Sequence, residues 1–366
     1  MFEITNEDNG ARAGELVTNH GTVFTPFFMP VATKASVKTL SSDELLDIGI
    51  EAVISNAFIL YLKPGEDIIE KAGGLHHFMN WDKAIFTDSG GFQMLKKEFV
   101  LSVTDEGVTF RSPFDGSHHM FTPEKCIKIQ ETLGSDVSMV LDECPPYGMD
   151  RSNIGKSIER TTRWAERSKR AQKSKKQLLF AIVQGGVFSD LRKKSASSLV
   201  ELDFDGFGIG GLSIGEPKKK MIEVLKYTMP LLPKEKPRYL MGVGSPVELL
   251  NAISLGVDVF DSAFPTKNAR HNAVYTANGS YNISRGKYSQ DFSPLEQGCC
   301  CLACQKYTRG YIRHLMAAYE TLGMRLISIH NLYFLTSLLK RAREAILESR
   351  FIKFKKEFFK TYCQKN

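Results

Sequence analysis

Short apolar segments recur along the chain, and each is followed by a segment with the spacing of an amphipathic helix. Eight can be counted, at residues 28–31, 52–55, 84–87, 138–141, 179–183, 207–209, 239–243 and 257–260. A repeated strand–helix alternation buries each strand between helices, and eight such units predict an α/β fold of the irregular (β/α)8 TIM barrel class. A doubly wound open sheet is the alternative with the same alternation.

Two insertions interrupt this alternation. Residues 100–121 alternate between apolar and polar and contain DEG at 105–107 and DGS at 115–117, which predicts β-hairpins. Residues 273–309 are rich in turn-forming residues and carry a cluster of cysteines. We therefore expect a barrel over 1–272, a zinc-binding subdomain over 273–330 inserted after the last strand, and C-terminal helices over 331–366 that complete the barrel.

Polar residues follow most of the apolar segments. The acidic ones are Asp88, Asp142 and Asp261, and they come after three different predicted strands. In a barrel the carboxyl ends of all strands meet at one rim, where the active sites of this fold lie. Carboxylates that converge there repel one another, and the pKa of at least one must rise. This cost favours a catalytic site over a structural one.

The cysteine cluster predicts a metal site. Cys299, Cys301 and Cys304 form C-x-C-x-x-C, with Cys300 between them and His330 downstream on a helical segment. Three thiolates and one imidazole make a closed tetrahedral zinc site, which is structural because no coordination position stays open. Spacing alone leaves open which three of the four cysteines bind the metal, and His314 is an alternative fourth ligand.

Composition limits where the protein works. Seven cysteines, four of them within residues 299–304, favour a reduced cytoplasmic protein over a disulfide framework. The polar N-terminus does not resemble a signal peptide, and no segment approaches the about 20 apolar residues of a membrane span. The net charge of +7 is compatible with a polyanionic partner. The basic segments 160–176 and 340–365 are equally compatible with solvated helix faces, and the phenylalanines of the second have the spacing of packing residues.

Several longer motifs resemble those of one enzyme family. They are DSGGFQ (88–93), VQGGV (183–187), GIGGLSIGEP (208–217), RYLMGVG (238–244), FDSAFPTKNAR (260–270) and the C-x-C-x-x-C followed by histidine. With them the chain resembles the bacterial tRNA-guanine transglycosylases, or queuine tRNA-ribosyltransferases, over most of its length. The resemblance implies a barrel with a zinc subdomain, a tRNA anticodon loop as partner, and commonly a homodimer. It also implies exchange of the wobble guanine for a 7-deazaguanine.

The resemblance assigns roles to the carboxylates. Asp261 matches the nucleophile that forms a covalent ribosyl-enzyme intermediate, and Asp88 matches the group that protonates the departing guanine. Cleaving a glycosidic bond with retention requires such a pair of carboxylates. Lys267 and Arg270 match residues that contact the flanking nucleotides. The family's arginine is lysine at the first of these positions, which removes bidentate geometry.

The resemblance also implies a set of base-binding residues. Phe92 and Met241 match the side chains that sandwich the base, and Ile214 and Cys144 match the bacterial choice for the small aminomethyl precursor of queuosine. Glu216 matches the residue at the peptide that contacts the aminomethyl group. The remaining substrate-binding positions are Ser89, Asp142, Gln184, Gly211 and Leu212.

Other functions remain open at this point. A queuine-accepting enzyme, or an archaeosine-type enzyme that places a cyano-deazaguanine in the tRNA D-loop, would perform the same exchange on another base. A non-catalytic RNA-binding partner subunit should lack the nucleophile, and Asp261 is present. An unrelated barrel glycosidase would leave the cysteine cluster and the basic charge unexplained.

Overall fold

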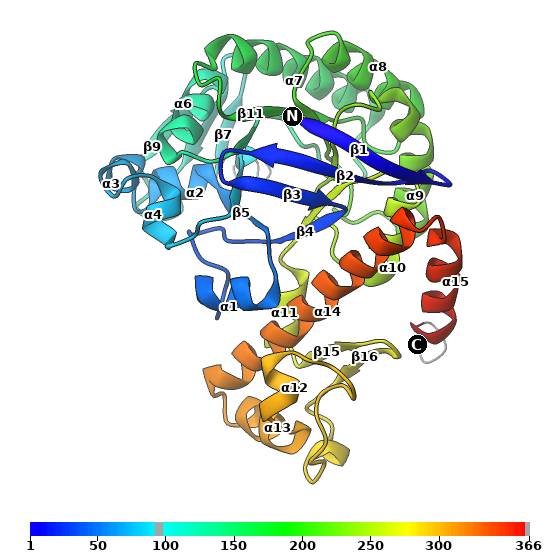
Figure 1. Ribbon diagram of the computed structural model, residues 1–366. Helices are drawn as coiled ribbons and strands as arrows, with labels where there is room; N and C mark the ends of the chain where they lie inside the picture. The colour runs from blue at the N-terminus through cyan, green and yellow to red at the C-terminus, as the bar shows by residue number, and fades with distance from the viewer. Residues whose placement is uncertain (92–97, 363–366) are drawn as a thin grey trace.

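The protein is a barrel of parallel strands in a computed structural model that describes residues 1–91 and 98–362 (Figure 1). The eight-stranded sheet has the order β4-β14-β13-β12-β11-β10-β6-β5, with every paired neighbour parallel. Its strands are β4 (Phe27–Pro30), β5 (Ala52–Asn56), β6 (Ala84–Asp88), β10 (Val137–Met139), β11 (Leu178–Val183), β12 (Gly206–Ile209), β13 (Arg238–Leu240) and β14 (Val259–Ser262).

A parallel bridge closes the sheet. Val31, just after β4, pairs with Ile54 of β5, and the N–H of Ala32 donates to the carbonyl of Ile54 at 2.7 Å. All eight predicted strands are present with ends within three residues of their expected positions, and the barrel prediction is confirmed over the open sheet.

Aromatic side chains fill part of the barrel interior. The ring of Phe86 (β6) lies edge-on to Phe180 (β11) at 5.9 Å, to Tyr239 (β13) at 6.2 Å and to Phe27 (β4) at 6.1 Å between centroids. Each such side chain contributes about 1.5–3 kcal/mol when it is fully buried. Edge-to-face contacts of this kind also fix ring orientation, so the strands are held in one register around the barrel.

Helices follow most of the strands and surround the sheet (Figure 1). Ser41 and Glu44 form a reciprocal capping box at the first of them, and Thr122 caps another whose first residue is proline. The helices of the barrel are α1 (Ser42–Ile48), α2 (Ala57–Leu62), α3 (Glu66–Lys71), α4 (Leu75–Met79), α6 (Pro123–Leu133), α7 (Arg151–Ala171), α8 (Ser189–Val200), α9 (Lys218–Thr228), η1 (Met229–Leu231), α10 (Pro246–Ile253) and α11 (Phe264–Arg270).

A three-stranded antiparallel sheet at the N-terminus has no counterpart in the sequence prediction. It consists of β1 (Phe2–Asp8), β2 (Ala11–Thr18) and β3 (Gly21–Thr25). Arg12 of β2 donates from Nε to Asp258 at 2.8 Å and from Nη2 to the carbonyl of Lys236 at 2.8 Å. These two acceptors precede β14 and β13, so this sheet lies over the N-terminal end of the barrel, away from the rim that carries the polar residues.

The predicted hairpin insertion is confirmed. It forms a second antiparallel sheet of β7 (Val100–Val103), β8 (Val108–Arg111) and β9 (His118–Phe121). Its two turns fall at 104–107 and 112–117, where the sequence predicts them. The insertion follows β6, so it belongs to the same rim of the barrel as Asp88.

The cysteine-containing region projects from the barrel (Figure 1). It contains β15 (Ala273–Thr276), β16 (Gly279–Asn282), η2 (Gly286–Tyr288), α12 (Leu302–Lys306) and α13 (Arg309–Ala317). The long helix α14 (Thr321–Leu347) leads from this region back to the barrel, where it packs against α11 and β4. It therefore spans the boundary we expected at residue 330, and the domain division stays a proposal.

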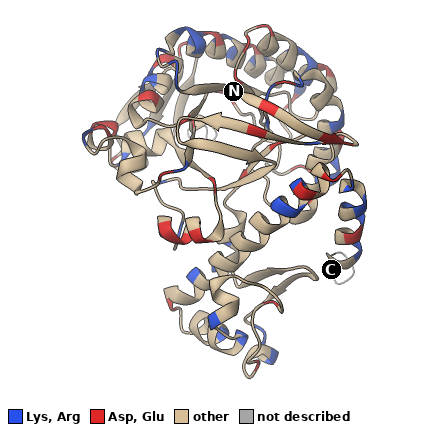
Figure 2. Ribbon diagram, in the orientation of Figure 1, with Lys and Arg blue, Asp and Glu red and all other residues tan. Residues whose placement is uncertain are grey.

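The C-terminal aromatic residues pack as the sequence predicts. In α15 (Phe351–Tyr362) the side chains of Phe351, Phe354 and Phe358 are buried and that of Phe359 is half-buried. On α7, the basic segment forms ion pairs from Arg167 to Glu124 and from Arg160 to Glu143. Figure 2 shows both signs of charge interspersed on the outer helices, which is typical of solvated helix faces.

Candidate active site

A cavity of about 410 Å³ opens at the C-terminal ends of the barrel strands. It is lined by the three acidic residues that the sequence places after β6, β10 and β14, namely Asp88, Asp142 and Asp261. The other predicted substrate residues on its wall are Cys144, Gln184, Gly211, Leu212, Ile214, Met241 and Lys267. The barrel thus brings residues that are up to about 180 positions apart into one cavity.

Asp261 is oriented by two donors. Its Oδ1 accepts a hydrogen bond from the hydroxyl of Tyr239 at 2.6 Å and one from the N–H of Gly242 at 2.8 Å. Gly242 has a φ of +77°, a conformation that glycine adopts without strain. Burial raises the pKa of Asp261, and the two hydrogen bonds oppose that rise. Its Oδ2 accepts no hydrogen bond from the described residues, so this oxygen can approach a ligand.

Asp88 is positioned by the neighbouring strand. Asn56 of β5 lies opposite Asp88 in the sheet register, and its Nδ2 donates to Oδ2 of Asp88 at 3.1 Å. The Oδ1 of Asn56 accepts from the N–H of Ile59 at 2.8 Å and so caps α2. The start of a helix therefore fixes the amide that contacts Asp88.

Asp142 and Gln184 form a polar pair after β10 and β11, the strands next to β6 in the sheet. Nε2 of Gln184 donates to Oδ2 of Asp142 at 2.6 Å. Burial raises the pKa of Asp142 to about 7, and the charge of Asp88 acts in the same direction. Oε1 of Gln184 is buried and has no hydrogen-bond partner among the described residues. Since an unsatisfied buried acceptor is costly, this oxygen is suited to a ligand N–H.

Two glycines make room for this pair. A Cβ at Gly210 or Gly211 would lie 2.5 Å from the side-chain amide of Gln184. Behind them, Arg192 is fully buried and donates to the carbonyls of Val183 and Gly186, both at 2.9 Å. Arg192 thereby fixes the chain on both sides of Gln184, a role that its position inside α8 did not reveal in the sequence.

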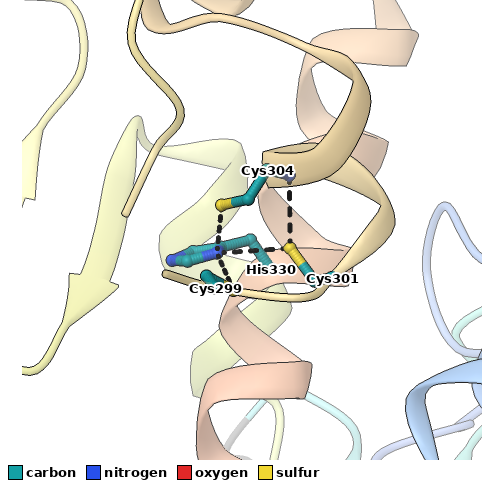
Figure 3. Close-up of side chains that lie close together, drawn as sticks. All are labelled: Cys299, Cys301, Cys304 and His330. Atoms are coloured by element: carbon teal, nitrogen blue, oxygen red, sulfur yellow. Dashed lines mark hydrogen bonds between the residues drawn. The ribbon is translucent and has the colours of Figure 1, made fainter. Parts of the chain in front are cut away.

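The cysteine cluster has the geometry of a metal site (Figure 3). Nδ1 of His330 lies 3.7, 3.5 and 3.3 Å from the sulfurs of Cys299, Cys301 and Cys304. Tetrahedral zinc, with Zn–S of about 2.3 Å and Zn–N of about 2.05 Å, separates sulfur from nitrogen by about 3.6 Å. The Nε2 of His330 lies 2.7 Å from the carbonyl of Tyr275, a contact that orients the ring as in metal sites.

The cluster resolves the alternatives that the spacing left open. The ligand atoms of Cys299, Cys301, Cys304 and His330 all lie within 4.8 Å of one another. Cys300 is exposed and His314 lies on α13, and neither belongs to this group. This set of donors could therefore hold a metal ion.

A family model described as queuine tRNA-ribosyltransferase matches residues 7–364. The chain belongs to this family. It is similar to the queuine tRNA-ribosyltransferase of Thermoanaerobacter pseudethanolicus, with 54% identity over 367 residues that cover 100% of this chain and 98% of the relative. The enzymes of that name from Pelotomaculum thermopropionicum (53%) and Fusobacterium nucleatum (51%) each cover 99% of this chain and 98% of their own length.

Some positions implied by the family resemblance lie beside the cavity rather than on its wall. Ser89 is buried and accepts from the N–H of Gly91 at 3.4 Å. Glu216 faces an adjoining cavity of about 190 Å³ and accepts from the N–H groups of Ser213 and Ile214. Arg270 is half-buried and donates to the carbonyl of Thr266 at 2.9 Å. Phe92 lies outside the described residues.

Sequence reasoning missed two aromatic residues of this family member's cavity. Tyr239 stands two positions before Met241, and residues two apart share a strand face, so alternation could have identified it. Phe264 follows β14 and is 47% exposed at the cavity mouth, although it reads as a packing residue in FDSAFPT.

No helix among residues 1–91 and 98–362 is long and apolar enough to cross a membrane.

Proposed function

We propose that the protein exchanges guanine at the wobble position of a tRNA anticodon loop for 7-aminomethyl-7-deazaguanine. The reaction is a pentosyl transfer of the tRNA-guanine transglycosylase type, through a covalent ribosyl-aspartate intermediate. The observation that carries the proposal is that one cavity combines a pair of catalytic carboxylates with a binding site for a base. Carboxylates from β6 and β14 stand at its wall, beside a buried Asp142–Gln184 pair suited to the edge of a purine.

Asp261 is the proposed nucleophile. Its Oδ1 is held by Tyr239 and Gly242, which leaves Oδ2 to attack C1′ of the ribose. The C1′–Oδ2 bond forms as the bond from C1′ to guanine breaks, and the electron pair leaves with the base. Asp88 gives its proton to the departing base. A positioned pair of carboxylates supplies both the covalent and the proton-transfer part of such a reaction.

The second half of the reaction reverses these steps with a new base. Asp88 takes a proton from the incoming deazaguanine, whose nitrogen then attacks C1′ and releases the carboxylate of Asp261. Two displacements at one carbon give overall retention, and the RNA backbone is never cut. The target nucleotide has to be extruded into the cavity, which suits an unpaired loop.

The base is held by residues of β10 to β13. Asp142 and Oε1 of Gln184 accept N–H groups of the purine edge, with the backbone at Gly211 and Leu212 beside them. Met241 covers one face of the base, and Phe92 is proposed for the other. Ile214 and Cys144 line the side where the substituent at position 7 would lie. Burial raises the pKa of Cys144 to about 12, so its thiol stays protonated, and the bulk of Ile214 beside it leaves room for a small substituent.

Supporting roles complete the proposal. Glu216 holds the backbone that carries Ile214, Ser89 supports the segment after Asp88, and Lys267 and Arg270 bind nucleotides next to the target. The Cys299/Cys301/Cys304/His330 cluster holds one structural Zn²⁺, which stabilises the fold and takes no part in the exchange. We also propose a cytoplasmic homodimer; thiolate ligands suit a reducing compartment, and the exposed Tyr311 and Tyr319 suit a subunit interface.

An exchange assay tests the function. Total tRNA is loaded with labelled guanine and chased with each deazaguanine and with queuine, and the labelled position is mapped. We expect release of label from the wobble position by the aminomethyl base. Release from the D-loop would indicate the archaeosine-type alternative, and no release with any base would indicate a non-catalytic subunit.

The nucleophile is tested separately by trapping. Wild-type protein incubated with tRNA should give an adduct that resists denaturing gels, and Asp261→Asn should give none. Asp88→Asn should bind tRNA nearly as the wild type does while it exchanges the base slowly. An adduct that survives in Asp261→Asn would overturn the assignment.

A further inference from the structure

We propose that Phe114, Lys34 and Lys63 bind the RNA strand that flanks the exchanged nucleotide. These three residues are called the rim cluster below. The proposal rests on the proposed function, because it assigns a second contact surface to the same RNA substrate. It adds residues that none of the sequence motifs contains.

The rim cluster is assembled from the three consecutive chain segments that follow β4, β5 and β6. Lys34 directly follows Thr33, which lines the active-site cavity after β4. Lys63 directly follows α2, the helix that Asn56 of β5 caps. Phe114 lies in the turn between β8 and β9, in the insertion after β6. Figure 1 shows α2 and β9 on the same side of the barrel. The cluster therefore belongs to the catalytic rim.

The side chains of the rim cluster contact one another at the surface. Nζ of Lys34 lies 5.6 Å and Nζ of Lys63 lies 5.8 Å from the centroid of the Phe114 ring. The ring is 40% exposed, and both lysines are exposed. An exposed phenylalanine between two cations combines the two features that bind single-stranded RNA, a stacking surface and positive charge.

The charges of the rim cluster are not neutralised. Neither Lys34 nor Lys63 forms an ion pair with a carboxylate of the described residues. On α7, by contrast, Arg163 pairs with Asp105 at 2.6 Å and Arg167 pairs with Glu124 at 2.7 Å. These arginines of the basic segment 160–176 are therefore compensated, whereas the rim lysines keep their charge for phosphate groups.

The arrangement of the cavity directs the RNA toward the rim cluster. The base-binding residues come from β10 to β13, and the two catalytic carboxylates come from β6 and β14. A base bound at the ends of β10 to β13 leaves its ribose between the carboxylates of β6 and β14. The sugar–phosphate chain must then leave over the other half of the rim, which runs β14-β4-β5-β6. Lys267 lies at the β14 end of this half, and the rim cluster occupies the rest of it.

The binding mode follows from this placement. The ammonium groups of Lys34 and Lys63 pair with phosphates of the strand and move off the ring as they do so. The uncovered face of Phe114 then stacks on a base that neighbours the target nucleotide. Since stacking and phosphate contacts read no base edge, the cluster is expected to contribute affinity with little sequence preference.

The test compares the exchange kinetics of three variants with those of the wild type. Phe114→Ala should raise the KM for tRNA about tenfold, the effect expected for the loss of one base–aromatic stack. Lys34→Gln and Lys63→Gln should each reduce the slope of log affinity against log salt by about 0.7, the contribution of one phosphate contact on a single strand. The KM for the free base should stay at the wild-type value in all three, because the base cavity is intact.

Matched control variants lie on the N-terminal side of the barrel. Phe24 of β3 is 39% exposed, nearly as much as Phe114, and has one cation, Arg343, at 5.0 Å from its ring. Phe24→Ala should leave the KM for tRNA unchanged. Lys353 lies on α15, whose first residue, Phe351, donates its N–H to Asp8 of β1, so Lys353 is on the side of the N-terminal sheet. Lys353→Gln should therefore leave the salt slope unchanged. Phe114→Leu keeps the apolar bulk without the aromatic face, so it should also raise the KM for tRNA even if Phe114→Ala folds poorly.

The outcomes separate this proposal from the proposed function. Wild-type protein that exchanges no base would overturn the proposed function. Wild-type protein that exchanges the base, with an unchanged KM for tRNA in Phe114→Leu and an unchanged salt slope in both lysine variants, would overturn the rim cluster alone. A rise in the KM for tRNA that the Phe24→Ala control shares would also overturn it.

Discussion

The hydrogen bond from Tyr239 to Asp261 offers a direct test of how the nucleophile is tuned. The Tyr239 side chain is fully buried in β13, and its hydroxyl lies 2.6 Å from Oδ1 of Asp261. Tyr239→Phe removes this donor and keeps the ring that packs against Phe86. The N–H of Gly242 still donates to the same oxygen at 2.8 Å, so the carboxylate stays in place.

The size of the effect follows from the charge on the acceptor. A hydrogen bond to an ionised group contributes about 1.5–3 kcal/mol, and 1.36 kcal/mol corresponds to one pKa unit. The bond favours the carboxylate over the acid, so its loss raises the pKa of Asp261 further, by about one to two. Burial already raises the pKa of this group in the wild type. Since only the ionised form attacks C1′, the acidic limb of the pH profile should move to higher pH by about the same amount.

The assay is the pH dependence of kcat/KM for guanine exchange, with adduct yield measured at each pH. Tyr239→Phe should lose activity and adduct together as the pH falls, and recover most of both at high pH. Tyr275→Phe is the control, because Tyr275 is buried and its hydroxyl accepts a hydrogen bond from Nδ2 of Asn268 outside the catalytic cavity. A variant whose activity falls equally at every pH, with the midpoint of the acidic limb unmoved, would refute the reasoning.

Three further predictions concern the base cavity and the metal cluster. Burial raises the pKa of Asp142 to about 7, so the folded protein keeps a proton that the unfolded chain releases near pH 3.8, and the stability of the wild type falls as pH rises through this interval. The gain in Tm of Asp142→Asn over the wild type should therefore grow from pH 4 to 7 and then level off. A gain that is the same at every pH would contradict the raised pKa. A strong chelator should lower the Tm of the wild type and have little effect on Cys301→Ser, with one zinc per wild-type chain by elemental analysis; a chelated wild type that melts normally would count against the site. Ile214→Gly should allow exchange of queuine, measured by release of labelled guanine, and an unchanged base preference would contradict the role of Ile214 in excluding it.

The sequence predicts the barrel well because its strands are buried on both faces. Such strands read as continuous apolar segments, and all eight are found where expected. The N-terminal sheet escapes this signal. In β1 the exposed and covered residues alternate, so few apolar residues stand together. Its place at the closed end of the barrel depends on the pairing of Arg12 with Asp258, which are 246 residues apart.

Site residues can be predicted from the sequence only where the type and position of a single residue indicate its function. Asp88, Asp142 and Asp261 are recognisable because charged groups at the ends of buried strands require a function. The partners that tune them are not recognisable. Tyr239 reads as a core residue until β13 and β14 are known to be neighbours, and Cys300 is as good a ligand as Cys301 until the backbone turns it to solvent.

The long helix α14 determines when this chain can finish folding. It packs against the first barrel strand and carries His330, and its end binds the N-terminal sheet. There the side chain of Asn6 donates to the carbonyl of Ile346 at 2.6 Å, and Asp8 accepts from the N–H of Phe351 at 2.7 Å. These contacts join positions about 340 residues apart. In a nascent chain, β4 therefore stays without this cover until the residues of α14 have left the ribosomal exit tunnel, long after β4 itself has been made.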